Sequence, residues 1–245
     1  ELADRMFAQA LDMGAQAELA EVTGLRREGK GFAVITPEGE YAAKTVILAT
    51  GAQHRRLGVP REEELAGNGV CYCAVCDGAF YKDRPVAVAG GGDAALQDAL
   101  LLSNGSSKVY IIHRRDEFRA EAANVSAARS RPNIEFCMSS RVAELEGEGE
   151  LTGLVIEPVT GGERRSIKVD GLFVAVGYEP ANAPFAELAH LDEAGWFAAG
   201  EDCAAGVPGV FAAGDCRAKT VRQLTTAVGD GAAAAVAACR HMDRL

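Results

Sequence analysis

The feature that most constrains the fold is a glycine-rich run, Gly-Gly-Gly-Asp-Ala-Ala at residues 90–95, placed directly after an apolar stretch. The stretch, residues 85–89, is short and continuous in apolar side chains, which predicts a buried strand. Residues 94–104 carry apolar side chains at helical spacing and are followed by Gly105, a residue typical of helix ends. Residues 108–112 predict the next strand. Residues 85–112 therefore form one βαβ unit, which indicates an α/β fold with a parallel sheet.

The same pattern, a strand followed by a glycine and a change of direction, recurs along the chain. It is found at residues 49–51, 90–92, 175–177 and 213–215. This recurrence suggests nucleotide-binding sheets. The polar stretch 53–68 and the turn at 177–180 interrupt the pattern, and we interpret them as two crossings between domains.

Charge and composition exclude several classes of partner. The 245 residues are 48% hydrophobic and 24% charged, as in an ordinary soluble protein, and the net charge of −10 disfavours nucleic acid and anionic membranes. No apolar run approaches the roughly 18 residues of a membrane span. The 7 cysteines are irregularly spaced, which argues against a secreted disulfide framework and favours the cytoplasm. The first residue is Glu1, with no signal peptide after it, so we expect the chain to begin inside a longer one.

The glycine run has the context that a dinucleotide-binding turn requires. Gly90 permits the tight turn, Gly92 lets the backbone approach a pyrophosphate, and Ala95 allows the helix to pack closely on the strand. The helix N-terminus then offers free N–H groups to the phosphates. Without that context, the pattern is also compatible with a plain turn between strand and helix.

Basic residues at the end of the next strand indicate which nicotinamide cofactor is bound. NAD-specific sites place a carboxylate there to hold the ribose 2′-hydroxyl. This chain instead has His113, Arg114 and Arg115, followed by Arg119. Arginines bind a 2′-phosphate bidentately, so the sequence predicts NADPH rather than NADH.

A pair of cysteines precedes this turn in the sequence Cys73-Ala74-Val75-Cys76-Asp77. The spacing allows both sulfurs to form a small ring, with one thiolate attacking a disulfide and the other resolving the mixed disulfide. Two alternatives are a pair of passive core cysteines and half of a zinc site with Cys71 as a third ligand, although no second Cys-x-x-Cys is present. Asp77 is a candidate general acid, and an ordinary turn aspartate is an equal interpretation.

Taken together, these motifs resemble those of the bacterial low-molecular-weight thioredoxin reductases. The matching segments extend over nearly the whole chain and are residues 48–52, 73–78, 90–95, 113–121, 208–215 and 222–223. The resemblance implies two Rossmann-like, three-layer α/β domains, with the NADPH domain inserted into the FAD domain. The FAD domain would comprise residues 1–55 and 181–245, and the NADPH domain, with the dithiol, residues 56–180.

The resemblance also implies residue roles. Cys76 would contact the flavin, Cys73 would attack the disulfide of thioredoxin, and Asp77 would be the acid/base. The NADPH contacts would come from Gly90, Gly92, Asp93, Ala94, Ala95, His113, Arg114, Arg115 and Arg119. The FAD contacts would come from Thr50, Gly51, Ala52, Gly214, Asp215, Arg222, Gln223 and Leu224.

The chain departs from the family pattern in three places. The N-terminal FAD-binding segment does not appear, so we expect an incomplete FAD domain that lacks its first βαβ unit. Ala79 stands where the family has the first of two aromatic residues, and Asn68 replaces a basic residue, both on the surface expected to receive thioredoxin. Cys71 adds a third thiol beside the pair.

The expected function is that of a homodimeric cytoplasmic flavoenzyme without nucleic-acid or membrane partners. Electrons would pass from NADPH through FAD and the Cys73/Cys76 dithiol to a protein disulfide, that of thioredoxin. Two alternatives remain: another thioredoxin-like or peroxiredoxin-type acceptor, or a truncated, flavin-free fragment that binds a nucleotide or a metal.

Overall fold

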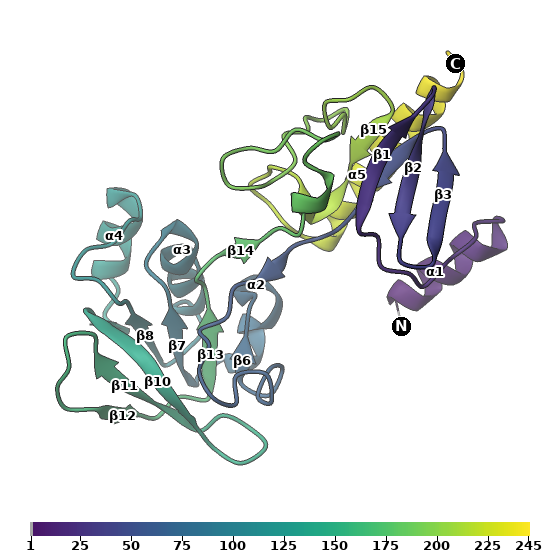
Figure 1. Ribbon diagram of the computed structural model, residues 1–245. Coiled ribbons are helices and arrows are strands. Elements are labelled where there is room, and N and C mark those ends of the chain that lie inside the picture. Colours follow the sequence, from purple (N-terminus) through teal and green to yellow (C-terminus); the bar gives the residue numbers. More distant parts are fainter. Residues whose placement is uncertain (1) are drawn as a thin grey trace. The chain divides into compact units, whose positions relative to one another are not determined.

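The computed structural model describes residues 2–245 and divides into two compact units (Figure 1). One unit comprises Glu1–Gln53 with Pro180–Leu245, and the other is His54–Glu179. The chain passes between them through β5 (Gln53–His54) and β14 (Tyr178–Glu179), two short strands that pair with each other. The boundaries expected from the sequence, after residues 55 and 180, lie one to two residues beyond those of the structure.

The unit His54–Glu179 is built on a five-stranded parallel sheet of order β6-β13-β7-β8-β9. Its strands are β6 (Val70–Cys71), β7 (Pro85–Ala89), β8 (Lys108–Ile112), β9 (Ile134–Cys137) and β13 (Gly171–Val174). Helix α3 (Asp93–Leu102) connects β7 to β8, so the βαβ unit predicted over residues 85–112 is present. Helix α4 (Ala122–Arg129), which was not predicted, connects β8 to β9.

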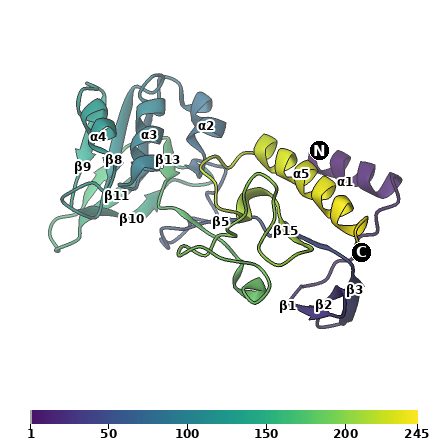
Figure 2. The same cartoon turned by 90° about the horizontal axis from the view of Figure 1, so that it is seen from above.

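This unit has three layers, with α3 and α4 on one face of the parallel sheet (Figures 1 and 2). The other face is covered by an antiparallel sheet of β10 (Ser140–Glu146), β11 (Gly153–Pro158) and β12 (Arg165–Ile167). Side chains of β7 alternate between the two cores. Val86 and Val88 pack with the helices, whereas Ala87 and Ala89 pack with the antiparallel sheet. A strand buried on both faces reads as a continuous apolar run, which is why β7 was predictable.

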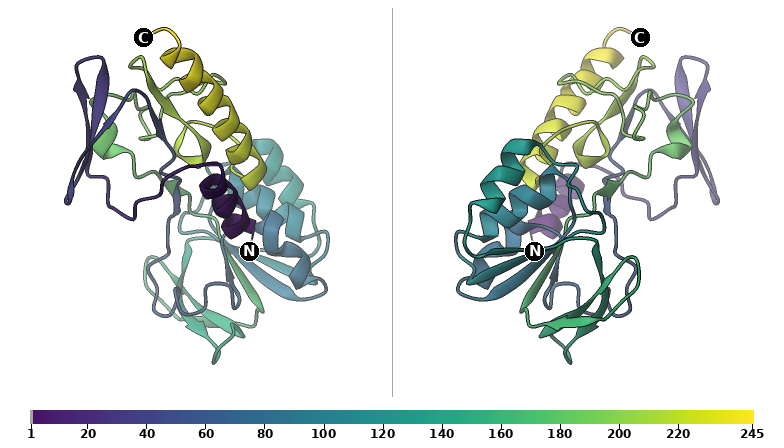
Figure 3. Two further views of the ribbon diagram at one scale, coloured as in Figure 1. Left: turned by 90° about the vertical axis from the view of Figure 1, so that its right-hand side faces the viewer. Right: turned by 90° about the vertical axis from the view of Figure 1, so that its left-hand side faces the viewer.

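The other unit combines an antiparallel sheet with a parallel strand pair. The sheet contains β1 (Gly24–Glu28), β2 (Gly31–Thr36) and β3 (Gly39–Ala43). The parallel pair is β4 (Val46–Leu48) with β15 (Val210–Ala212), and helix α5 (Leu224–Met242) packs on β15 (Figure 3). The chain also has short helices. Those in the unit His54–Glu179 are α2 (Ala74–Asp77) and η1 (Gly78–Tyr81), and those in the other unit are η2 (Ala183–Phe185) and η3 (Gly214–Cys216).

Residues 41–48 are divided between two strands. Strand β3 ends at Ala43 and β4 begins at Val46, and the two strands belong to different sheets. In β3, Ala43 pairs antiparallel with Phe32, whereas Val46 pairs parallel with Val210. An apolar run does not record which partner each of its residues pairs with, so the break between the strands leaves no mark in the periodicity.

The first helix, α1 (Leu2–Asp12), has apolar side chains at helical spacing and ends before Gly14. None of its residues is buried, and Leu2, Phe7 and Leu11 are exposed. Within residues 2–245, no helix has both the length and the apolar character needed to cross a bilayer.

Candidate functional site

The predicted dithiol is a disulfide bond between Cys73 and Cys76, with a Cα–Cα distance of 5.3 Å that suits such a bond. Cys73 is the N-cap of the short helix α2, and the Cys76 backbone N–H donates to its sulfur at 3.1 Å. Within the unit His54–Glu179, Cys76 is exposed and Cys73 is half-buried. A donor aimed at the sulfur favours its negatively charged form once the bond is reduced. The pair is therefore arranged for thiol–disulfide exchange.

Cys71, two residues before the dithiol, lies beside Asp77, the residue after it. Cys71 is buried, and its sulfur lies 3.3 Å from the Tyr81 hydroxyl. Burial raises the pKa of the Cys71 thiol, and the nearby Asp77 carboxylate raises it further. Burial also raises the pKa of Tyr81 above its usual range. Cys71 is thus a buried, neutral thiol next to Asp77.

Metal-ligating side chains do not gather in the part of the chain that the structure describes. No group of three or more His, Cys, Asp or Glu residues within 2–245 is placed to hold a metal ion. Cys71 forms a hydrogen bond with the Tyr81 hydroxyl, and Cys73 and Cys76 form a disulfide with each other.

The glycine turn between β7 and α3 uses its three glycines differently. A Cβ on Gly90 would clash with the Ala175 carbonyl oxygen and would lie 2.7 Å from the Ala95 Cβ. A Cβ on Gly91 would overlap the ring of His113. A Cβ on Gly92 would meet nothing within 4 Å. Gly90 and Gly91 are thus required by the fold, whereas the space in front of Gly92 is open.

His113 is a buried support of this turn. Its side chain is packed under Gly91, stacks on Phe118 at 5.4 Å between ring centroids, and places Nε2 3.1 Å from the Glu117 carbonyl oxygen. The residue is 6% exposed. Burial lowers the pKa of His113, and the neighbouring arginines lower it further. The ring is therefore neutral at pH 7 and contributes packing rather than charge.

Two other predicted NADPH residues mark the start of α3. The Asp93 carboxylate accepts the Glu121 N–H at 2.8 Å and the Asn124 side-chain amide at 2.8 Å, and these bonds lower the pKa of Asp93. It thereby links the starts of α3 and α4. Ala94 is exposed in the first turn of α3, where no side chain caps the N–H groups. These free N–H groups can donate to a bound anion.

Arg114, Arg115 and Arg119 surround the carboxyl end of β8. All three are exposed, and among residues 2–245 none of their side chains makes a hydrogen bond or an ion pair. The Arg119 backbone N–H donates to the Gly91 carbonyl, which ties this segment to the glycine turn. Three unpaired guanidinium groups beside an open glycine suit a phosphate-bearing ligand.

The predicted FAD residues of the other unit gather at one edge of the strand pair β4/β15. Because the strands are parallel, Thr50, Gly51 and Ala52 after β4 lie beside Gly214 and Asp215 after β15. Thr50 Oγ1 donates to Asn182 Oδ1 at 2.8 Å. The Asn182 amide in turn donates to the carbonyls of Gly195 and Cys216 at 2.9 and 2.8 Å. Asn182, which is fully buried, thus joins the two strand ends.

Asp215 lies in the turn η3 and has an unusual side chain. Its Oδ1 atom is buried and has no hydrogen-bond partner among the described residues. A desolvated carboxylate oxygen without a donor costs free energy of the order of 1–3 kcal/mol or more. Hydroxyl groups of a ligand could satisfy it.

Arg222, Gln223 and Leu224 lead into α5. The Arg222 guanidinium lies 3.8 Å above the ring of Trp196, and its Nε donates to the Asp215 carbonyl at 3.1 Å. Gln223 is the N-cap of α5 and forms a capping box with Thr226. Leu224 is 57% exposed. The three residues therefore border the Asp215 turn without occupying the space at Oδ1.

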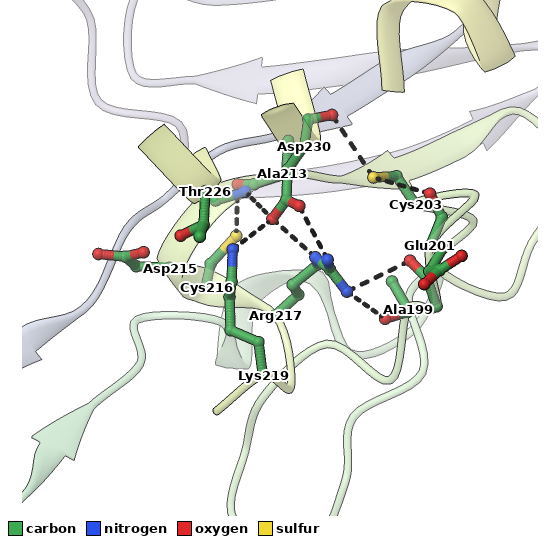
Figure 4. A network of polar contacts seen from close by, with 12 residues as sticks. Ala199, Glu201, Cys203, Ala213, Asp215, Cys216, Arg217, Lys219, Thr226 and Asp230 are labelled. Atoms are coloured by element: carbon green, nitrogen blue, oxygen red, sulfur yellow. Dashed lines mark hydrogen bonds and ion pairs between the residues drawn. The ribbon is translucent and has the colours of Figure 1, made fainter. Parts of the chain in front are cut away.

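Several residues around the Asp215 turn were not identified from the sequence. Asn182 lies between Pro180 and Pro184 and matches no motif. Asp230 lies in α5 and forms ion pairs with Arg217 and Lys219 (Figure 4). A helical aspartate between two glycines gives no signal of a partner that precedes it by 13 residues, so only the fold brings these groups together.

Comparisons with known proteins agree with this geometry. A family model described as pyridine nucleotide-disulphide oxidoreductase matches residues 8–231. A thioredoxin reductase of Listeria monocytogenes is 39% identical over 100% of this chain and 77% of its own length. One from Treponema pallidum is 40% identical over 100% of this chain and 80% of its own. The crystal structure of thioredoxin reductase from Streptococcus pyogenes superposes with a TM-score of 0.93 at 37% identity, covering 100% of this chain and 80% of that one.

Proposed function

The chain belongs to the thioredoxin reductase family of pyridine nucleotide-disulphide oxidoreductases, and we propose on this basis that Cys73 and Cys76 deliver electrons from NADPH and FAD to the disulfide of thioredoxin. The enzyme is an oxidoreductase of a family that uses both cofactors. The observation that carries the proposal is the accessible Cys73–Cys76 pair, held in the same compact unit as the open glycine turn. The unit His54–Glu179 would bind NADPH, and the other unit would bind FAD.

The NADPH site fits the residues that are present. The open space before Gly92 and the uncapped start of α3 suit a pyrophosphate. Arg114, Arg115 and Arg119 suit the 2′-phosphate, because their side chains are exposed and unpaired. Gly90, Ala95, His113 and Asp93 would support this surface from behind, through the contacts described above.

The FAD site also fits, on the evidence of one atom. Asp215 Oδ1 is buried without a partner, and a hydroxyl of the ribityl chain would supply the missing donor. Thr50, Gly51 and Ala52 lie at the same sheet edge, and Arg222, Gln223 and Leu224 border the turn. A bound FAD would supply two-electron redox chemistry here, between the nicotinamide hydride and the Cys73–Cys76 disulfide.

The cysteines then carry out two exchange steps. The Cys73 thiolate attacks one sulfur of the acceptor disulfide, and the other acceptor sulfur leaves as a thiolate and takes a proton. Cys76 next attacks the Cys73 sulfur, which releases the second acceptor thiol and restores the Cys73–Cys76 bond. Asp77, the residue after Cys76, is the proposed proton donor for the leaving thiolates.

We also propose a homodimer that works in the cytoplasm, without nucleic-acid or membrane partners. The net charge of −10 supports the absence of a nucleic-acid partner. The five cysteines outside the pair are free thiols, which supports a reducing compartment.

The first experiment is the visible absorbance of the purified protein supplied with FAD, before and after anaerobic NADPH. A bound flavin band that bleaches supports the cofactor assignment, whereas failure to bind FAD would contradict it. Thioredoxin reduction is then followed with NADPH as the electron donor. Cys73→Ser should reduce its rate by about 1,000-fold or more, since the attacking thiolate is lost, while NADPH still bleaches the flavin.

Cys239→Ser is the matched control, because Cys239 is an exposed free thiol outside the pair. It should leave the rate of thioredoxin reduction unchanged. Turnover that survives in Cys73→Ser would contradict the assigned role. Faster reduction of a peroxiredoxin or glutaredoxin disulfide than of thioredoxin would keep the chemistry and change the acceptor.

A further inference from the structure

The polar cluster behind the Asp215 turn is centred on Asp230, a residue of α5 that is 8% exposed (Figure 4). Its carboxylate accepts Arg217 Nε at 2.7 Å and Arg217 Nη2 at 2.8 Å. It also accepts Lys219 Nζ at 2.7 Å and the Gly214 backbone N–H at 3.0 Å. One carboxylate therefore binds two cations and one backbone donor of the turn.

The cluster is buried, so each of its charges needs an opposite charge beside it. The side chains of Arg217, Lys219 and Asp230 are 14%, 9% and 10% exposed. A buried charge is costly unless it is paired and hydrogen-bonded. The Arg217 hydrogen bonds, followed by the Lys219 and Gly214 bonds, hold the pKa of Asp230 well below its usual range. The carboxylate is therefore charged at neutral pH.

The hydrogen bond to Gly214 places this cluster directly on the Asp215 turn. Gly214 has φ +82 and is the first residue of η3, and its N–H is held by Asp230. No dashed line joins the Asp215 carboxylate to Arg217 or Lys219, whose ion pairs are with Asp230 (Figure 4). Both cations are close to Asp215 in the chain, and a flexible turn would let either one pair with it. Asp230 binds both cations, and Asp215 Oδ1 is left buried and unpaired.

We propose that Asp230 is a positioning residue of the FAD site. It fixes the turn through the Gly214 N–H and holds Arg217 and Lys219 away from Asp215, so that the Asp215 carboxylate is free for a hydroxyl donor of the cofactor. This inference rests on the proposed role of Asp215 in FAD binding.

The test is the FAD dissociation constant of the flavin-depleted protein, measured by quenching of flavin fluorescence. Asp230→Asn should weaken FAD binding by about tenfold or more, since a charged hydrogen-bond network is lost. Asp215→Asn should also weaken it. Because Asp230 acts through Asp215, the double variant should bind FAD at most about twofold more weakly than Asp215→Asn does. If the factors by which the two single variants raise the FAD dissociation constant multiply in the double variant, the proposal is overturned.

Two further variants separate positioning from folding and from net charge. Asp230→Asn combined with Lys219→Met removes one charge of each sign, so the cluster keeps the net charge of the wild type. It should still bind FAD about tenfold more weakly, and wild-type affinity in this variant would overturn the proposal. Glu157→Gln is the matched control, since Glu157 pairs with Arg141 and Arg164 in the other unit. It should not change FAD binding.

A second readout needs no bound flavin. Amide hydrogen exchange of Gly214 should speed up in Asp230→Asn and stay unchanged in Glu157→Gln, and equal protection in all proteins would overturn the proposal. Trp196 fluorescence reports the unfolding of this unit separately, because it is the only tryptophan of the chain. If the wild type itself does not bind FAD, the proposed function fails and this inference fails with it. If the wild type binds and Asp230→Asn binds equally well, only the inference is overturned.

Discussion

The glycine turns after β7 and after β15 occupy equivalent places in two different parallel sheets, and they are supported in opposite ways. The turn at residues 90–92 rests on a neutral buried ring, that of His113, which fills the space beneath Gly91. The turn at Gly214 rests on a buried carboxylate, that of Asp230, which holds its N–H. One support is van der Waals packing and the other is a charged hydrogen-bond network.

The cations are distributed in opposite ways as well. At the first turn, Arg114, Arg115 and Arg119 are exposed and unpaired. At the second, Arg217 and Lys219 are buried and already bound to Asp230. Free cations can bind a ligand phosphate directly, whereas occupied cations act on the ligand through the turn that they stabilise. The two turns should therefore respond differently to mutation, salt and pH.

Removing the free arginines should have a strong effect on cofactor choice. In Arg114→Ala/Arg115→Ala, the KM for NADPH should rise by about 100-fold, because two charge-assisted contacts to the 2′-phosphate are lost. The KM for NADH, which lacks that phosphate, should rise less than about threefold. Steady-state kinetics with each cofactor measures both values.

The matched control is Arg129→Ala/Arg131→Ala, which removes the same charge from exposed positions at and just after the end of α4. It should leave the NADPH preference unchanged. In the wild type, rising salt should weaken NADPH binding more than NADH binding, since exposed charges are screened. An equal rise of both KM values in Arg114→Ala/Arg115→Ala would contradict the 2′-phosphate assignment.

The first of these turns could be predicted from the sequence, because its determinants are local. The buried strand, the glycines and the following helix are adjacent in the chain, and each has its own periodicity. The role of Gly91 was missed, since the ring that it accommodates belongs to His113, the residue after the next strand. His113 was expected among the NADPH contacts, and the structure places it buried beneath the turn.

The second turn could be predicted only in part. Gly214 and Asp215 follow a buried strand and were identified, but Asn182 and Asp230 reach the turn from distant parts of the chain. Strand β1, with the sequence Gly-Leu-Arg-Arg-Glu, was missed because most of its side chains are exposed and charged. Strand β10 was missed because an irregularity between Val142 and Glu144 interrupts its alternation. Pairing between distant segments decides such elements, and no local pattern records it.

The Gly91 and Gly92 positions should separate the support of the first turn from its ligand surface. Gly91→Ala places a methyl group in the His113 ring and should cost about 1–3 kcal/mol of unfolding free energy. Gly92 has φ −98 and open space, so Gly92→Ala should raise stability by about 0.4–1 kcal/mol. Its methyl group would still occupy the expected pyrophosphate space and should raise the NADPH KM by about tenfold.

Urea unfolding and steady-state kinetics of both variants provide these numbers. Each glycine serves as the control for the other, since the same methyl group is added one residue apart. Loss of stability in Gly92→Ala, or an unchanged KM in that variant, would show that the open space is not a ligand surface.

The smallest effect concerns pH. Burial lowers the pKa of His113 in the folded protein below its ordinary value of about 6.5. The unfolded chain therefore binds the proton more readily, and the stability contributed by the neutral ring is complete above about pH 6.5 and declines as pH falls through the window below it. Asp230 behaves differently, because its pKa is lowered: its contribution to stability is complete above the ordinary aspartate pKa of about 3.9 and declines only as pH falls below that value.

The measurement is the unfolding free energy between pH 7.5 and 5 for the wild type and His113→Gln. The difference between the two proteins should shrink as pH falls, since only the wild type loses stability by protonating this ring. Burial raises the pKa of Asp98 to about 6, so the stability that this residue contributes is lost as pH rises, the opposite direction. Asp98 is present in both proteins, so its effect cancels in the difference. The difference between the wild type and Asp230→Asn should stay flat over the same range. A decline in that second difference above pH 5 would mean that the charged support is no more resistant to protonation than the ring.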